Sequence, residues 1–231
     1  LLANTDEQSM IWRHMFIRSY LERDIPSFNP RLPSETLYRL WQMIAHQQGG
    51  LYTASQLALS LSVTSPTVDR YVDLLVDLFL VRRLKPWHGN TKKRLVKSPK
   101  LYVRDSGILH ALLNISSMDT LLGHPVVGTS FEGYLIDNIL SQLPLGMEAY
   151  FYRTARGAEL DLYLIGEDHK TYAIEIKRSL QHHLSRGFHS ACLDLKPDYK
   201  FLIYEGDDKF TMKHEVRVYN VMQLISFIRA C

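Results

Sequence analysis

Two short segments in which apolar and charged residues alternate constrain this chain most. They are residues 157–161, with the sequence GAELD, and residues 173–177, with the sequence AIEIK. Because successive side chains of a strand point to opposite faces, Glu159 and Asp161 are expected to share one face, and Glu175 and Lys177 to share one face. If the two strands pair, Asp161, Glu175 and Lys177 can meet at one point.

Two carboxylates beside an ammonium are the chemical equipment of a metal-dependent phosphodiester hydrolase. We expect Asp161, Glu175 and the backbone carbonyl of Ile176 to hold Mg²⁺, with Mn²⁺ as a substitute, since these ions take hard oxygen ligands. Lys177 is expected to position or help deprotonate the attacking water and to offset charge at the phosphate. The alternative is a solvated strand face with an incidental ion pair.

Composition limits the classes of protein to consider. The chain has 231 residues, 46% of them hydrophobic, which predicts two globular domains. The net charge is only +3, so a nucleic-acid footprint would have to come from local clustering. Two cysteines cannot build a disulfide framework, which predicts a reduced, cytoplasmic setting. The chain has no apolar run long enough to span a membrane, which predicts that it has no membrane partner. The first residue is Leu1, so we expect a fragment of a longer chain.

The first half of the chain reads as helices followed by a winged helix-turn-helix. Within residues 1–48, apolar residues recur at helical spacing over 9–23, and Pro26 is expected to stop this helix. A second helix is predicted from Ser34. Residues 49–120 are predicted to form the winged-helix domain, with a turn at 62–64 and a second helix from Ser65-Pro66. Strands at 80–84 and 101–103 would form its hairpin.

A run of basic residues occupies this predicted hairpin. Between Arg82 and Lys100 there is no acidic residue, and the basic ones are Arg82, Arg83, Lys85, Lys92, Lys93, Arg94, Lys97 and Lys100. We expect a phosphate-contacting surface for DNA, and the alternative is a solubilising loop. Arg70 is the one basic residue near the start of the second helix, beside Asp69 and Asp73, so the hairpin rather than this helix would supply most affinity.

Residues 121–231 predict a second domain with a mixed sheet flanked by helices. A helix from Thr129 or Ser130 precedes strand-like runs at 149–153, 160–165 and 172–177, and a helix over 185–195 precedes a strand at 201–204. A strand at 216–219 and a helix over 221–229 complete the domain. The overall fold class is therefore α/β (α+β).

The Asp and Glu-x-Lys pattern in this order of elements resembles the core of the PD-(D/E)XK superfamily of nucleases, which has a restriction-endonuclease-like fold. In that superfamily a further acidic residue comes from the first helix, and the resemblance implies that Glu132 is catalytic with Asp161, Glu175 and Lys177. The alternative for Glu132 is a first-turn acid favoured by the helix dipole.

A wider resemblance covers nearly the whole chain. Residues 20–25 (YLERDI), the helix-turn-helix, residues 100–107 (KLYVRDSG), Phe131-Glu132 and the Glu175-x-Lys177 strand look like the C-terminal half of a prokaryotic family of AAA+ ATPases, a half known as domain of unknown function 4143. This implies an ATPase domain that binds ATP and lies N-terminal to Leu1, with residues 1–48 as its end. An oligomer is an open alternative. The chain has no Gly-x4-Gly-Lys-Ser/Thr segment, so no ATP site is assigned to it.

Three functions of different classes follow. The first is a DNA-binding, Mg²⁺-dependent nuclease module of the ATPase, favoured by Asp161, Glu175 and Lys177. The second is a non-catalytic DNA-binding or regulatory module, and the third is a protein-interaction module. The basic run favours the first two over the third.

Overall fold

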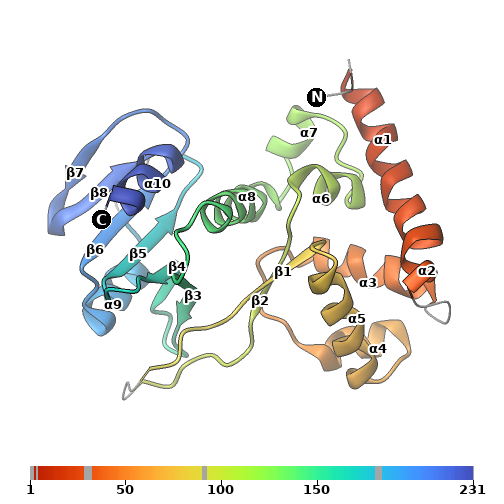
Figure 1. Ribbon diagram of the computed structural model, residues 1–231, viewed down its shortest axis with the longest axis horizontal. Helices are drawn as coiled ribbons and strands as arrows, with labels where there is room; N and C mark the ends of the chain where they lie inside the picture. Colours follow the sequence, from red (N-terminus) through yellow and green to blue (C-terminus); the bar gives the residue numbers. More distant parts are fainter. Residues whose placement is uncertain (1–2, 4, 29–32, 90–92, 180–183, 231) are drawn as a thin grey trace. The chain divides into compact units, whose positions relative to one another are not determined.

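A computed structural model describes residues 3, 5–28, 33–89, 93–179 and 184–230 (Figure 1). The chain forms two compact units. The first unit comprises Leu1–Arg83 and Leu101–Gly133, and the second comprises Leu84–Lys100 and Tyr134–Cys231. This division differs from the predicted domains of 1–48, 49–120 and 121–231, because residues 84–100 belong to the second unit, whereas residues 1–48 and 121–133 belong to the first.

The helices of the first 48 residues share one core with the helix-turn-helix. They are α1 (Asp6–Ser19), the π-helix η1 (Tyr20–Asp24), α2 (Ile25–Phe28) and α3 (Ser34–His46). Leu37 and Trp41 of α3 are fully buried in the same cluster as Leu57 and Val72. The predicted separate helical segment is therefore part of the first unit.

The predicted stop at Pro26 is wrong, because helical structure continues to Phe28. Proline has no N–H to donate and its ring crowds the carbonyl four residues earlier. The chain changes to π-helix just before it, where the N–H of Ile25 bonds to the carbonyl of Tyr20. A π-turn of this kind shifts the hydrogen-bond ladder by one residue, which lets Pro26 follow without a break.

The predicted order of a winged helix follows. Helices α4 (Ala54–Leu61) and α5 (Ser65–Asp77) precede the two-stranded sheet of β1 (Val81–Leu84) and β2 (Lys100–Val103). Ser62 has a left-handed backbone with φ of 54°, and the Thr64 hydroxyl accepts the N–H of Thr67, so the turn ends one helix and caps the next. Helices α6 (Ser106–Leu112) and α7 (Met118–Leu122) then lead to α8 (Val127–Ser141), which continues into the second unit.

The second unit is built on a mixed sheet, as predicted, but in the described residues the sheet has six strands where five were predicted. Its strand order is β3-β4-β5-β6-β8-β7. The strands are β3 (Glu148–Arg153), β4 (Glu159–Ile165), β5 (Thr171–Ile176), β6 (Tyr199–Ile203), β7 (Phe210–Met212) and β8 (Val216–Tyr219), with a 3₁₀ turn η2 (Lys213–Glu215). Strands β3, β4 and β5 are antiparallel, whereas β6 is parallel to β5 and β8 is parallel to β6.

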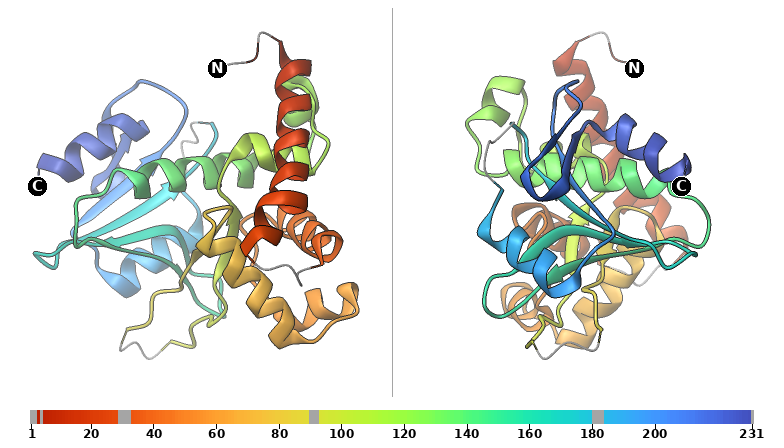
Figure 2. Two further views of the ribbon diagram at one scale, coloured as in Figure 1. Left: turned by 45° about the vertical axis from the view of Figure 1, so that its right-hand side comes forward. Right: turned by 90° about the vertical axis from the view of Figure 1, so that its left-hand side faces the viewer.

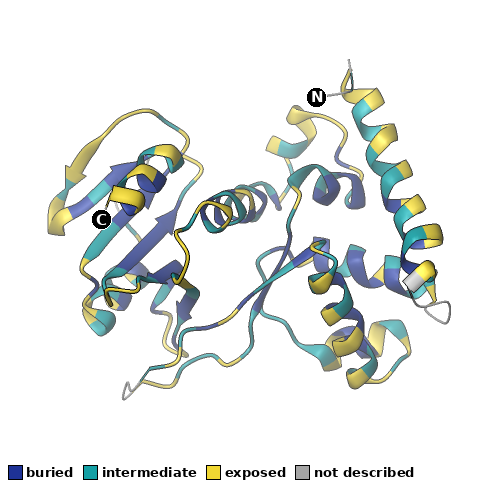
Figure 3. Ribbon diagram, viewed as in Figure 1, coloured by how far each residue is buried: buried dark blue, intermediate teal, exposed yellow. Residues whose placement is uncertain are grey.

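Helices cover both faces of this sheet. Figure 2 shows α9 (Arg186–Leu195) on one face and α10 (Val221–Ala230) on the other. Phe188 and Ala191 of α9 are fully buried against a cluster that includes Ala173 and Leu202. Strands β4 and β5 are therefore almost entirely buried, while β7 at the edge is largely exposed (Figure 3). Within the described part of the chain, no helix combines the length and the apolar character needed to cross a membrane.

Candidate active site in the second unit

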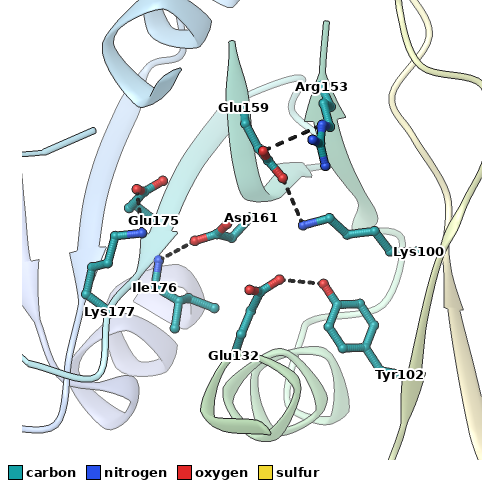
Figure 4. Close-up of polar contacts among 9 residues, drawn as sticks. All are labelled: Lys100, Tyr102, Glu132, Arg153, Glu159, Asp161, Glu175, Ile176 and Lys177. Atoms are coloured by element: carbon teal, nitrogen blue, oxygen red, sulfur yellow. Dashed lines mark hydrogen bonds and ion pairs between the residues drawn. The ribbon is translucent and has the colours of Figure 1, made fainter. Parts of the chain in front are cut away.

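The carboxylate of Asp161 is fixed to the strand that carries the Glu-x-Lys segment. Its Oδ2 accepts the backbone N–H of Ile176 at 2.8 Å, and Ile176 stands between Glu175 and Lys177 (Figure 4). Strands β4 and β5 pair with Leu162 opposite Ile174, so the next pair in this register would be Asp161 and Glu175. Asp161 is only 8% exposed.

A β-bulge lies at Asp161. Tyr150 pairs with Tyr163 and Tyr152 pairs with Leu160, so Asp161 and Leu162 together stand opposite one residue of β3. Leu160 and Tyr163 consequently belong to the same core cluster although they are three residues apart. An extra residue bends a strand and re-aims its side chains, so simple alternation does not hold through this part of β4.

Glu175 and Lys177 form a close ion pair at the end of β5. Lys177 Nζ lies 2.8 Å from Glu175 Oε1, and the Glu175 side chain is 4% exposed against 31% for the lysine. A carboxylate buried this deeply needs a cation or several donors to remain charged. The pair leaves the ammonium partly open to solvent, where a water or a phosphate can reach it.

The donor set around Asp161 and Glu175 fits Mg²⁺ rather than a metal held entirely by side chains. Among the described residues no group of three or more His, Cys, Asp or Glu side chains is placed to share a metal ion. Mg²⁺ keeps several waters and is commonly bound by one or two carboxylates together with substrate phosphates. Two carboxylates and the Ile176 carbonyl match that requirement in number and in hardness.

Glu132 belongs to the first unit, at the sixth position of α8 rather than in its first turn. The hydroxyl of Tyr102 donates to its Oε1 at 2.5 Å. A side chain on the neighbouring Gly133 would meet Gln48 Nε2 at 2.6 Å and Tyr102 at 3.0 Å. Gly133 therefore makes room for Gln48 and Tyr102, and the helix-dipole alternative for Glu132 does not apply.

Residues 84–100, here called the arm, do not form a free hairpin. Trp87 N–H donates to the carbonyl of Phe151, and Phe151 N–H donates to the carbonyl of Lys85. Farther along, Val96 N–H donates to the carbonyl of Arg153. The described parts of the arm, residues 84–89 and 93–100, therefore contact β3, the edge strand of the sheet, and Trp87 packs on Tyr152 and Tyr163.

Among the described residues that were predicted to contact DNA, Arg83, Lys93 and Lys100 have acidic partners within the chain. Arg83 pairs with Asp73 at 2.7 Å, and Lys93 pairs with Asp194 at 3.4 Å. The Lys100 side chain is 5% exposed and lies 3.1 Å from Glu159 Oε1 (Figure 4). Lys100 does not fit the predicted role of a phosphate contact, because its buried ammonium is inaccessible to a ligand.

The other predicted basic residues are more accessible. Lys85, Arg94 and Lys97 of the arm are exposed, as is Arg70 on α5, and Arg82 is half-buried. Lys92 lies outside the described residues. On α5 the neighbouring Asp69 accepts a hydrogen bond from the Tyr52 hydroxyl at 2.6 Å. Burial raises the pKa of the Tyr52 phenol, and this hydrogen bond adds to the effect.

Two family models match the chain, one in each half. The family model described as Domain of unknown function (DUF8612) matches residues 1–119, and Domain of unknown function (DUF4143) matches residues 127–224. The predicted resemblance to the latter is thus confirmed for that range. Neither matching model is of a PD-(D/E)XK nuclease, and that part of the resemblance stays a prediction.

Two curated relatives are the uncharacterized proteins Mb2031c of Mycobacterium bovis and Rv2008c of Mycobacterium tuberculosis. Each is 39% identical over 217 residues, which is 93% of this chain and 48% of the relative. The chain therefore spans about half the length of these relatives. A solved structure of MepR, a transcription regulator of the Staphylococcus aureus multidrug efflux pump MepA, aligns at 16% identity and a TM-score of 0.28 over 59% of this chain and 84% of MepR. A likeness at that level carries no argument about this chain.

Proposed function

The chain belongs to the family described as Domain of unknown function (DUF8612), and we propose that its second unit is a Mg²⁺-dependent hydrolase of phosphodiester bonds in nucleic acid. The observation that carries the proposal is the hydrogen bond from Ile176 N–H to Asp161, which ties one buried carboxylate to the segment that holds Glu175 and Lys177. Two carboxylates of low exposure beside a partly exposed ammonium suit metal-assisted hydrolysis.

The order of elements supports the same proposal. Helix α8, the antiparallel strands β3, β4 and β5, helix α9 and the parallel strand β6 follow one another in the order predicted for a nuclease-like core. The candidate residues lie where β4 and β5 adjoin, and the bulge at Asp161 is of the kind found next to active sites.

Each residue of the site would have its own role in catalysis. Asp161, Glu175 and the Ile176 carbonyl would hold Mg²⁺, which when bound would polarise a phosphoryl oxygen and lower the pKa of a bound water. Lys177, held by Glu175, would orient the attacking water and offset charge on the phosphate. The water oxygen would bond to phosphorus while one ester P–O bond breaks, giving a phosphate monoester and a hydroxyl.

DNA is the proposed substrate, and an ATPase domain that binds ATP is the proposed N-terminal neighbour in the whole protein. A second candidate function is a non-catalytic module, either DNA-binding or protein-interacting. It is favoured by the ion pairs of Arg83 and Lys100, because these two predicted DNA contacts bind acidic residues of the chain itself. In that case Glu175 and Lys177 would be a structural pair.

Calorimetric titration with Mg²⁺ and Mn²⁺, beside cleavage of plasmid and single-stranded DNA, tests the proposal. Glu175→Gln keeps the size of the side chain and removes its charge, so it should abolish metal binding and cleavage. Glu205→Gln removes an exposed carboxylate of the same unit and should behave like the wild type. No metal-dependent heat and no cleavage by the wild type, or equal activity in Glu175→Gln, would favour the non-catalytic module.

A further inference from the structure

A cavity of about 630 Å³ lies within the second unit, and its lining does not include Asp161, Glu175, Ile176 or Lys177 of the candidate active site. Three segments that are distant in sequence line it. They are residues 93–94 of the arm, the turn 154–158 between β3 and β4, and the outer side of α9 from Arg186 to Asp194. None of these segments includes an undescribed residue.

Backbone contacts hold the three walls together. Ala155 N–H donates to the carbonyl of Arg94 at 2.9 Å, which fixes the arm to the turn. Within the turn, the Thr154 hydroxyl accepts the N–H of Ala158. A Cβ on Gly187 would lie 2.8 Å from the carbonyl oxygen of Gly157, so α9 approaches the turn as closely as it does because Gly187 has no side chain.

The lining of the cavity is strongly positive. Four cationic side chains face one acidic residue, Asp194, and they are Lys93, Arg94, Arg156 and Arg186. Asp194 is already engaged, since it pairs with Lys93 and accepts a hydrogen bond from the Tyr152 hydroxyl at 3.0 Å. In the described part of the chain, Arg94, Arg156 and Arg186 have no ion pair or side-chain hydrogen bond. Their charge is therefore uncompensated around a preformed hollow.

We infer that this cavity binds a backbone phosphate of a nucleic-acid strand, an inference that rests on the proposed function. Guanidinium groups present several N–H donors in a planar fork that matches phosphate oxygens. The Ser190 hydroxyl adds a further donor to the lining. Ala158 lines the cavity and directly precedes β4, the β-strand that carries Asp161, so the cavity adjoins a β-strand of the candidate active site.

Fluorescence anisotropy with a labelled single-stranded oligonucleotide, in EDTA and over a salt series, tests the inference on the 231-residue chain. The double variant R156Q/R186Q should bind more weakly and flatten the plot of log affinity against log salt by about 0.7, because both arginines line the site of one phosphate and each lost phosphate contact removes about 0.7 on a single strand. The control K196Q/K213Q removes the same charge from exposed positions outside the cavity and should change the slope far less. Equal behaviour of the two double variants would overturn the inference.

A second variant separates a site from a diffuse positive field. Ser190→Trp fills the cavity from an exposed helical position and leaves all four cations in place, so it should also weaken binding. Wild-type affinity in this variant would overturn the cavity as the binding site. Calorimetry with inorganic phosphate completes the test. If R156Q/R186Q loses phosphate binding but keeps its affinity for the oligonucleotide, the ligand of the cavity is free phosphate. That result would overturn the inference that the cavity binds a nucleic-acid strand.

The failure of this inference is distinguishable from failure of the proposed function. Oligonucleotide binding in EDTA requires no metal, and Glu175→Gln should retain it while losing cleavage. Cavity-dependent binding by a wild type that never cleaves would therefore overturn the hydrolase alone. Cleavage lost in Glu175→Gln, together with unchanged binding by R156Q/R186Q, would overturn the cavity alone.

Discussion

The ammonium of Lys100 lies 3.1 Å from the carboxylate of Glu159 and 5.4 Å from the centre of the Phe151 ring. Lys100 ends the basic run of the arm, yet its side chain is 5% exposed. Glu159 is also 3.7 Å from Arg153, which is more exposed than Lys100. The last cation of the run thus joins the arm to β4 inside the second unit.

Lys100→Met should destabilise the chain by about 1–3 kcal/mol, because Glu159 loses its closest cation while remaining partly buried. Lys97→Met, an exposed change in the same arm, should stay within about 0.5 kcal/mol of the wild type. Urea denaturation of both variants measures the difference. Equal stabilities would mean that the Lys100 pair contributes no more than an exposed one.

Much of the sheet could be predicted from the sequence because local patterns determine it. The strands predicted at 149–153, 160–165 and 172–177 are found within one residue at either end, since alternation and β-branched residues act locally. The bulge at Asp161 could not be predicted, because it depends on the register between β3 and β4. The Asp161 contact to Ile176 follows from that tertiary arrangement.

The arm shows the limit of the same reasoning. A basic run without acids reads as a surface for phosphates, and its partners Asp73, Glu159 and Asp194 come from elsewhere in the chain. Arg156 and Arg186 join this group only through the fold, since they are 30 residues apart and separated from the arm. The local signal for Arg186 is the capped helix start at Ser185, whose hydroxyl accepts the N–H of Phe188.

Gly187→Ala should lower the stability of the second unit by about 1–3 kcal/mol, because the new methyl group would meet the backbone oxygen of Gly157 at 2.8 Å. Gly128→Ala is a matched control at the second position of another helix, where no atom lies within 4 Å of the added group. That change should stabilise by up to about 1 kcal/mol. Thermal unfolding of the two variants would contradict the prediction if their melting temperatures moved in the same direction.

The stability of the first unit should fall when the pH drops below 6.5. Burial lowers the pKa of His110 from its ordinary value of 6.5, and repulsion from Arg13 and His124 adds to the effect, against attraction by Asp105. The unfolded chain then binds a proton at a higher pH than the folded one, so stability is complete above pH 6.5 and declines as the pH falls toward the folded pKa.

His110→Gln isolates this contribution, because glutamine can still reach the Ser130 hydroxyl, which lies 2.8 Å from His110 Nε2. The loss of unfolding free energy between pH 7.5 and 5.5, measured by urea denaturation, should be smaller in the variant. The variant keeps His124, so the difference between the two proteins reports His110 together with its repulsion from His124. An identical loss in both proteins would show that His110 titrates alike in the folded and unfolded states.

Two substitutions of Asp161 distinguish a structural role of this residue from a catalytic one. Asp161→Asn retains an oxygen that can accept the N–H of Ile176, so its unfolding free energy should stay close to that of the wild type. Asp161→Ala removes this acceptor at a buried position and should cost about 1–3 kcal/mol. Both variants lack the carboxylate and should lose Mg²⁺ binding in calorimetry. If Asp161→Asn were as unstable as Asp161→Ala, the charge itself would support the fold and Asp161 would be a structural residue rather than a metal ligand.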